Sequence, residues 1–325
     1  MTHTWSDYTS CMADKITAFL AYKRALARKF HTEESVFRLF DRYLFENSIV
    51  RLEDITPMSI EGFLISRPRK SPRSYNHLLG VIRCFFSWLV GQGILDRSPV
   101  KARPRRATTT RLPFLFGPSE AKRLLAAADD LLDNPRAPFR GPTYSMIFAL
   151  LYGLGLRVGE VSRLCGKDVD LKRRLLVIRK TKFAKSRLVP FGPQMAKKLE
   201  AYLHHRGELA PDSPVFSFAG QKPIHPCTIS QTFHRMLPAL NLDIPPGIQP
   251  PRLHDLRHAF ATGTLLRWYR MGVDPTSRLI HLSTFLGHVN PSSTAVYLSI
   301  TRDLLDQANE RFERFGNAAV KGVSI

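Results

Sequence analysis

One stretch of the chain concentrates side chains that can transfer protons and hold anions. It reads Arg252-Leu-His254-Asp-Leu-Arg257-His258. On a helix, His254 and Arg257 are three positions apart and share a face. His254 and His258, four apart, could instead bind zinc, but the glutamate of an HExxH motif is missing and Arg257 would repel a cation. The stretch therefore disfavours a metal site, and His258 by itself is more typical of a structural histidine than of a catalyst.

Two further basic residues, Arg157 and Lys182, could hold an anion together with these side chains. Arg157 follows a Gly-Leu-Gly-Leu turn and precedes Glu160 by three positions, so the carboxylate can orient the guanidinium. Lys182 lies in the basic run Arg179–Arg187, between two β-like segments. Each pattern alone has a plainer interpretation, because a surface ion pair contributes little and a charged hairpin tip is commonly solvated.

A histidine and a tyrosine follow near the end of the sequence. Leu286-Gly-His288 leads into a turn and a short helical stretch, and Tyr297 comes nine residues after His288. A tyrosine in isolation is more typical of a packed core than of a nucleophile. The significance of Tyr297 therefore depends on which residues surround it.

Helical patterns fill residues 1–100, the first domain that we expect. Apolar residues recur there at helical spacing, and Thr56 and Ser71, each followed by proline, mark two helix starts. The expected helices cover about Cys11–Phe30, Thr32–Leu44, Thr56–Leu64 and Ser71–Leu89. Four helices of this length make a compact all-α unit.

A basic linker, residues 101–112, is expected to follow. Its segment KARPRRATTTR contains a proline, three threonines and no acidic residue, a composition typical of an exposed connector rather than a packed element. We expect its cations to lie along DNA phosphates, although a solvated connector would have the same composition. These cations are Lys101, Arg103, Arg105, Arg106 and Arg111.

The remaining residues, 113–325, are expected to form a mainly helical second domain with a small antiparallel sheet. β-like runs at Leu175–Arg179 and Arg187–Phe191 flank the basic turn, and Val215–Phe218 is a candidate third strand. Helices are expected from Pro118, from Tyr144 to Gly153, and at about Thr228–Met236, His254–Tyr269, Pro275–Leu286, Pro291–Leu298 and Thr301–Phe315. The predicted fold class is thus mainly α, with an all-α domain ahead of a mixed α+β domain.

The charge of the chain indicates a polyanionic partner. Its 325 residues carry a formal net charge of +21. Residues 1–112 hold 19 Lys and Arg against 10 Asp and Glu, and residues 113–325 hold 29 against 17. A positive field over both parts favours nucleic acid.

The sequence predicts neither a membrane protein nor a disulfide-linked one. It contains no basic amphipathic anchor and no apolar span long enough for a bilayer, and Met1–Ser10 lacks the order of a signal peptide. We therefore expect a cytoplasmic protein. The scattered cysteines form no CxxC pair, which favours reduced thiols over disulfides or zinc. They are Cys11, Cys84, Cys165 and Cys227.

Taken together, these motifs resemble those of the tyrosine recombinases, or phage integrases. The most specific are Gly155-Leu-Arg-Val-Gly-Glu160, His254-Asp-Leu-Arg-His258 and Leu286-Gly-His with Tyr297, in this order and spacing. Lys185-Ser-Arg-Leu-Val-Pro190 matches the segment after the family's catalytic lysine, which places that lysine at Lys182. The resemblance covers roughly residues 118–314, and residues 1–100 match in type only, as a helical core-binding domain.

The resemblance implies cleavage and rejoining of DNA strands. Tyr297 would attack a phosphodiester and form a 3′-phosphotyrosyl link, which a second strand's 5′-hydroxyl reseals without metal, ATP or another cofactor. Arg157 and Arg257 would hold the non-bridging oxygens, since guanidinium groups bind such oxygens bidentately and stay charged.

Proton transfers complete the implied mechanism. His254 would accept the proton of the phenol, Lys182 would donate one to the leaving 5′-oxygen, and His288 would hydrogen-bond a non-bridging oxygen. Glu160 and His258 would support the site, and Lys180 and Lys185 would contact DNA.

The implied partner is double-stranded DNA with specific sites, bound by a homotetramer that joins two duplexes. A type IB topoisomerase and a DNA-binding protein without cleavage activity are the alternatives. Chain size, the N-terminal helices and the spelling of the motifs favour recombination, and the complete residue set argues against a non-catalytic binder. The biological task, whether phage integration, transposition, cassette exchange or dimer resolution, stays open.

Overall fold

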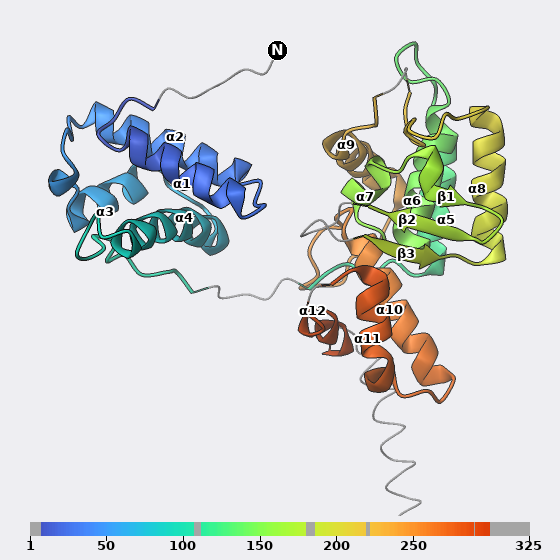
Figure 1. The fold of residues 1–325 in the computed structure, drawn as a ribbon. Coiled ribbons are helices and arrows are strands. Elements are labelled where there is room, and N and C mark those ends of the chain that lie inside the picture. Colours follow the sequence, from blue (N-terminus) through green and yellow to red (C-terminus); the bar gives the residue numbers. More distant parts are fainter. Residues whose placement is uncertain (1–7, 107–111, 180–185, 219–221, 289, 300–325) are drawn as a thin grey trace, which may run out of the picture. The chain divides into compact units, whose positions relative to one another are not determined.

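The structure is a computed structural model that describes residues 8–106, 112–179, 186–218, 222–288 and 290–299 (Figure 1). The chain forms two compact units, Met1–Thr110 and Arg111–Ile325, and each is described by itself. Most described residues are helical, and the strands among them form one antiparallel sheet. The predicted fold class, mainly α with a small sheet, is confirmed.

The described residues of the first unit form four α-helices and one short 3-10 helix, Leu52–Asp54. The α-helices are α1 (Ala13–Ala25), α2 (His31–Glu46), α3 (Pro57–Ser66) and α4 (Pro72–Gly91). The predicted caps of α3 and α4 are confirmed, because Thr56 accepts from the Ser59 N–H and Ser71 from the Ser74 N–H. Helix α1 is shorter than predicted, since Ala27 adopts a left-handed backbone with φ of 57° and so ends the helical turn.

Aromatic rings form the core of this unit. Phe19 of α1, Phe37 of α2 and Phe85 of α4 meet edge to face, with centroids 5.2 to 5.6 Å apart. Phe40 of α2 meets Phe63 of α3 in the same way at 5.0 Å. All five rings are fully buried, and each contributes roughly 2 to 3 kcal/mol of hydrophobic stabilisation. The four helices therefore share one hydrophobic core.

Part of the predicted linker is bound to α4. The Arg105 N–H donates to Asn76 Oδ1 at 2.7 Å, and Asn76 Nδ2 donates to the Arg105 carbonyl at 2.8 Å. The Arg105 guanidinium lies over the Tyr75 ring, 4.0 Å from its centroid. Arg83 adds a bond to the Ala102 carbonyl. Residues 101–106 form no helix or strand and are mostly exposed, as expected of a connector, but the hydrogen bonds of Asn76 and Arg83 attach them to α4.

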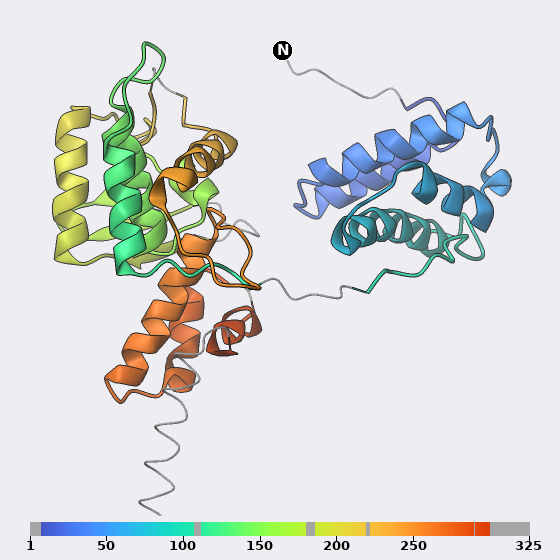
Figure 2. The ribbon, with the colours of Figure 1, turned by 180° about the vertical axis from the view of Figure 1, so that it is seen from behind.

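The second unit combines a sheet with eight described helices (Figures 1 and 2). The helices are α5 (Pro118–Asp129), α6 (Arg140–Gly153), α7 (Val158–Ser162), α8 (Pro193–Arg206), α9 (Pro226–Met236), α10 (Asp255–Arg270), α11 (Pro275–Leu286) and α12 (Ser292–Ala295). Figure 1 shows the sheet in front of α5 and α6, and Figure 2, from behind, shows α5 and α8 in front. Helix α6, buried without a break over Thr143–Leu151, is the centre of the core.

The described strands are β1 (Val169–Asp170), β2 (Leu175–Ile178) and β3 (Arg187–Pro190), in the order β1-β2-β3. The predicted pairing of the last two is confirmed, with Leu176 opposite Val189. The third strand predicted at Val215–Phe218 is wrong. Val215 and Phe216 are apolar because they belong to the core, not to the sheet.

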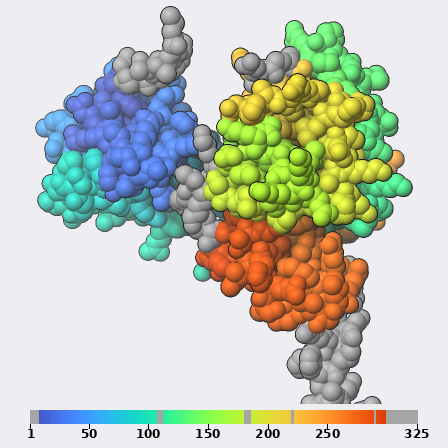
Figure 3. Space-filling view, turned by 45° about the vertical axis from the view of Figure 1, so that its right-hand side comes forward, coloured from blue at the N-terminus to red at the C-terminus, as the bar shows by residue number. Residues whose placement is uncertain are grey.

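The last described elements hold Tyr297 against a small apolar cluster. Ala261 and Leu265 of α10 and Leu282 and Leu286 of α11 pack with Tyr297, which lies in the 3-10 turn Val296–Ser299. Figure 3 shows these C-terminal elements, in orange to red, adjoining the yellow-green segment that forms the sheet. The predicted helix at Thr301–Phe315 lies outside the described residues. Within the described part of the chain, no helix has the length and apolar content needed to cross a membrane.

The contact between α4 and the linker predicts a protease-sensitive variant. Asn76→Leu removes both hydrogen bonds to Arg105, at about 1 kcal/mol each, so local opening should increase by roughly tenfold or more. Limited trypsin digestion should then cut faster after Lys101 and Arg105. Asn47→Leu, at the end of α2 and bonded only to its own helix among the contacts described, should digest like the wild type. Equal rates for the two variants would contradict the role of Asn76.

Candidate active site

Glu160 of α7 joins two arginines. Its Oε1 accepts from Arg157 Nη1 at 2.9 Å and from Arg187 Nη1 at 2.8 Å. Its Oε2 accepts from the Arg157 backbone N–H and from Arg187 Nη2, both at 2.9 Å. Burial of this carboxyl would raise its pKa, but the hydrogen bonds and charges of Arg187 and Arg157 lower the pKa to about 2. Glu160 is therefore a carboxylate that fixes both guanidinium groups.

The C-terminus of α11 binds three arginines through successive carbonyls. Helix ends leave their last four carbonyls without intrahelical partners. The backbone N–H groups of Gly287 and His288 satisfy two of these, in a Schellman turn. The next three carbonyls each accept from one guanidinium: Phe285 from Arg187 (2.8 Å), Leu286 from Arg257 (2.7 Å) and Gly287 from Arg157 (2.9 Å). The negative end of the helix dipole favours this clustering of cations.

Gly287 explains the Leu-Gly-His motif. Its φ of +69° places it in the left-handed region that closes the turn. A Cβ at this position would also lie 2.8 Å from Arg187 Nη1. The glycine thus permits both the turn that carries His288 and the close approach of Arg187.

Arg257 is buried at the junction of α6, α10 and α11. Its side chain is 1% exposed, and Nη1 donates to the Gly155 carbonyl at 2.6 Å. Burial, followed by the charge of Arg157, lowers the pKa of Arg257 to about 10, so it stays protonated at neutral pH. Gly155, with φ of +58°, turns its carbonyl toward this guanidinium, and a Cβ there would clash with Phe260.

The hydroxyl of Tyr297 meets His258 rather than His254. Oη lies 3.0 Å from His258 Nδ1. Burial raises the pKa of Tyr297, while the charges of Arg257 and Arg157 and a hydrogen bond from Arg257 act in the opposite direction. The two histidine rings pack at right angles with centroids 4.7 Å apart. His258 Nε2 in turn lies 4.0 Å from Asp255 Oδ1, so a buried carboxylate stands on the far side of that ring.

His288 is held by a buried threonine. Its Nδ1 lies 2.7 Å from Thr294 Oγ1, and Thr294 is fully buried. Burial and the charges of Arg257 and Arg157 lower the pKa of His288 to about 4. Burial together with His258 and Arg257 lowers the pKa of His254 to about 4. Both imidazoles are therefore neutral at pH 7, and each retains one N–H donor.

The other predicted site residues belong to the linker and to the basic run after β2. Lys180, Lys182, Lys185 and Arg111 lie outside the described residues, so their roles stay predictions. Lys101, Arg103 and Arg106 are exposed on the first unit. Arg105 is held by Tyr75 and Asn76, so its guanidinium is engaged.

Sequence analysis missed three residues that complete the site: Arg187, Thr294 and Asp255. Arg187 was treated only as the start of a β-like run. The one signal was its place two positions before Val189, because alternate residues of a strand share a face. Asp255, fully buried and bound to Arg252, gave no signal in a stretch already crowded with charges.

No described residues form a metal centre: among them, no group of three or more His, Cys, Asp and Glu side chains is arranged to hold a metal ion. A pocket of about 380 Å³ lies beside Glu160, between α7 and β2. Its charged lining residues are largely paired with one another, as Lys167 is with Asp212.

Comparison with known proteins gives consistent matches. The model of the phage integrase family matches residues 116–303. "Putative integrase/recombinase y4rB" of Sinorhizobium fredii is 36% identical over 258 residues, 76% of this chain and 80% of that protein. Tyrosine recombinase XerC of Myxococcus xanthus is 32% identical over 279 residues, 82% of this chain and 85% of that protein.

Solved structures share the fold. The Tn1549 transposon integrase in complex with transposon right end DNA superposes with a TM-score of 0.65. The match covers 93% of this chain and 99% of that one, at 15% identity. An alignment at this identity is informative about the arrangement of helices and strands.

The lowered histidine pKa values predict a loss of stability in mild acid. In the unfolded chain His254 and His288 titrate near 6.5, whereas in the folded protein each has a pKa of about 4. Between these values the unfolded state binds more protons, so the free energy of unfolding must fall as pH falls from 6.5 toward 4. Urea unfolding at pH 7, 5.5 and 4.5 measures this.

His288→Gln should make that pH dependence shallower, because one of the two groups no longer titrates. His204→Gln, on the exposed end of α8, should follow the wild-type curve. The same pH dependence in all three proteins would show that His288 does not contribute to it.

Proposed function

Because the chain belongs to the phage integrase family and is a tyrosine-type site-specific DNA recombinase, we propose that Tyr297 is the nucleophile with which it breaks DNA. The observation that carries this proposal is the position of Oη, which is hydrogen-bonded to His258 and lies beside the buried cation Arg257. A phenol needs an acceptor and nearby positive charge to become reactive, and this site provides both.

The reaction follows from these contacts. Tyr297 Oη forms a bond to the scissile phosphorus while the bond to the 5′-oxygen breaks, which leaves a 3′-phosphotyrosyl link. The 5′-hydroxyl of a second strand then attacks the same phosphorus and releases the tyrosine. One phosphoester replaces another at each step, so strand exchange needs no external energy source.

Arg157 and Arg257 are proposed to bind the non-bridging oxygens. Each uses part of its guanidinium to hold the end of α11, and the five N–H groups of an arginine leave others for a phosphate. Their backbone partners fix them before DNA binds, so little reorganisation is needed as charge develops. Neutral His254 and His288 are proposed as further donors to the same oxygens.

We assign the proton of the phenol to His258 instead of the predicted His254. Proton transfer requires hydrogen-bond reach first and a suitable pKa second. His258 Nδ1 satisfies the first condition at 3.0 Å. Its pKa is lowered, first by burial, so it is neutral and able to accept. Lys182 remains the proposed proton donor to the leaving 5′-oxygen.

Double-stranded DNA is the partner supported by the DNA-bound relatives. We propose that specific recombination sites are bound by a homotetramer on two duplexes, and that the protein acts in the cytoplasm without a cofactor. The proposed DNA contacts beyond the site are Lys101, Arg103, Arg106, Arg111, Lys180 and Lys185, with Arg105 anchoring the linker instead. Relatives named as recombinases disfavour the topoisomerase and non-catalytic alternatives.

Tyr297→Phe should abolish covalent capture of DNA. In a nicked cognate site, cleavage releases a short fragment that carries the freed 5′-hydroxyl. Once this fragment diffuses away the strand cannot be resealed, so the wild type should accumulate a protein–DNA adduct on denaturing gels. The phenylalanine variant keeps the packing of the ring but has no nucleophile, and it should bind the site with nearly unchanged affinity. A wild type that binds yet never forms the adduct would contradict the proposal, and exchange of flanks between two marked duplexes would exclude simple relaxation.

His258→Ala should lower the rate of adduct formation by roughly 10²- to 10⁴-fold, the usual contribution of a general base. The loss should shrink as pH rises, because more phenolate forms without the imidazole. His254→Ala is the matched comparison. Its rate of adduct formation should depend on pH as that of the wild type does, without the alkaline recovery expected of His258→Ala. If His254→Ala instead shows the alkaline rescue and His258→Ala does not, His254 is the acceptor.

A further inference from the structure

Arg187, the first residue of β3, takes part in the site although its own nitrogens are engaged. Nε donates to the Phe285 carbonyl and both Nη atoms donate to Glu160, at 2.8 to 2.9 Å. Its side chain is 9% exposed, whereas that of Arg157 is 32% exposed. Every guanidinium nitrogen of Arg187 donates to a protein oxygen, whereas the guanidinium of Arg157 donates through Nη1 and Nη2 only among the contacts described. Arg187 therefore has less to offer a phosphate than Arg157, yet both are bound to the same carboxylate.

That carboxylate is saturated. Its two oxygens offer about four lone-pair sites, and four N–H groups fill them, two from Arg157 and two from Arg187. Each arginine therefore determines how the oxygens are presented to the other. Without Arg187, half of these bonds are lost, and Glu160 becomes free to rotate about its terminal torsion and to carry Arg157 with it.

Arg187 also joins elements that are far apart in the sequence. Its bond to Phe285 fixes the end of α11, two residues before Gly287 and three before His288. In the sequence it follows Lys182 by five positions. One side chain thus connects the strand after the lysine turn, the carboxylate that orients Arg157 and the turn that carries His288.

We propose that Arg187 is a positioning residue for DNA cleavage: through Glu160 and Phe285 it places Arg157 and His288 at the scissile phosphate. The proposal rests on the function proposed above. Because the guanidinium of Arg187 is engaged by protein oxygens, its loss should slow the chemical step and leave DNA affinity nearly unchanged. Arg157 is proposed to stabilise the charge that develops on the non-bridging oxygens. The loss of cleavage rate in an Arg187 variant should therefore be smaller on a substrate with less of that charge.

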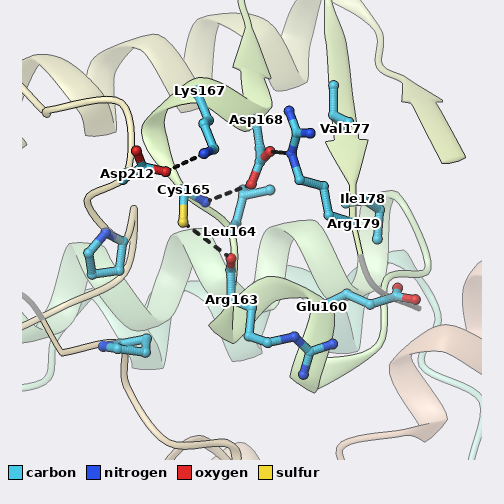
Figure 4. Close-up of a pocket in the computed structure, with 12 residues that line it drawn as sticks. Glu160, Arg163, Leu164, Cys165, Lys167, Asp168, Val177, Ile178, Arg179 and Asp212 are labelled. Carbon is cyan, nitrogen blue, oxygen red and sulfur yellow. Dashed lines mark hydrogen bonds and ion pairs between the residues drawn. The ribbon is translucent and has the colours of Figure 1, made fainter. Parts of the chain in front are cut away.

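A matched control lies in the same unit. Arg179, just after β2, is paired with Asp168, a carboxylate that is 5% exposed and is also bound by the Cys165 N–H. Figure 4 shows this pair, with the Glu160 carboxylate in the same pocket pointing away from it. Arg179→Gln therefore removes a guanidinium from a buried carboxylate without touching the orientation of Arg157.

The experiment compares Arg187→Gln, Arg187→Lys and Arg179→Gln with the wild type. Adduct formation on a nicked site is measured under single-turnover conditions with DNA bound to saturation. It is measured again on a site whose scissile phosphate is replaced by a neutral methylphosphonate. Equilibrium binding and thermal unfolding of each variant show whether affinity and folding are retained.

Arg187→Gln should lower the rate on the phosphodiester by about 10²-fold, comparable to removal of one preorganised donor. On the methylphosphonate the loss should shrink to roughly fivefold or less, since less charge develops there. Arg187→Lys should lose nearly as much on the phosphodiester, because an ammonium keeps the charge but cannot bind a carboxylate bidentately. Arg179→Gln should stay within about threefold of the wild type on both substrates, as a change remote from the developing charge should.

A double substitution keeps the test decisive if Arg187→Gln destabilises the fold. When two residues act through one contact, the loss in Glu160→Gln/Arg187→Gln is smaller than the product of the single losses. Three results would each overturn the proposal. They are a rate loss in the double variant equal to the product of the single losses, equal rate losses of Arg187→Gln on the phosphodiester and the methylphosphonate, and a wild-type rate for Arg187→Gln. A wild type that forms no adduct on either substrate would instead contradict Tyr297 as the nucleophile.

Discussion

The end of α11 and the carboxylate of Glu160 hold three guanidinium groups close together. The rest of the site depends on the balance between the repulsion of these charges and the groups that compensate it. Three like charges repel one another, and burial of Arg257 adds a desolvation penalty. The structure offsets both with one full negative charge and with the three carbonyls of Phe285, Leu286 and Gly287. The arginines are thus positioned before any phosphate arrives.

The same packing controls the environment of Tyr297, the proposed nucleophile. Tyr297 is buried against α10 and α11, which raises its pKa, while the clustered arginines lower it. These opposing effects keep the phenol protonated at rest and place it beside groups that can stabilise the phenolate. Neutral imidazoles suit this setting, because a further cation next to Arg257 would be costly. Shape and electrostatics of the site therefore have a common origin in the contact between α10 and α11.

The linker illustrates how a basic segment can have two roles. Arg105 uses its backbone and guanidinium to bind α4, whereas Lys101, Arg103 and Arg106 stay exposed beside it. From the composition of the linker, all of these basic residues were predicted to contact DNA in the same way. The hydrogen bonds of Arg105 hold this part of the linker on α4.

The sequence by itself determined the fold class, the helices of the first unit, most helices of the second, the paired strands β2 and β3, and the family, since these depend on local spacing, caps and motif spelling. Helix α8 (Pro193–Arg206) was not predicted. Tertiary structure alone decided that Val215–Phe218 belongs to the core, that His258 and not His254 meets Tyr297, and that Arg187 shares Glu160 with Arg157. The last two are contacts between residues 39 and 27 positions apart in the sequence. Spacing along the chain determines which face a residue occupies, but only the packing of distant elements determines which partner it meets there.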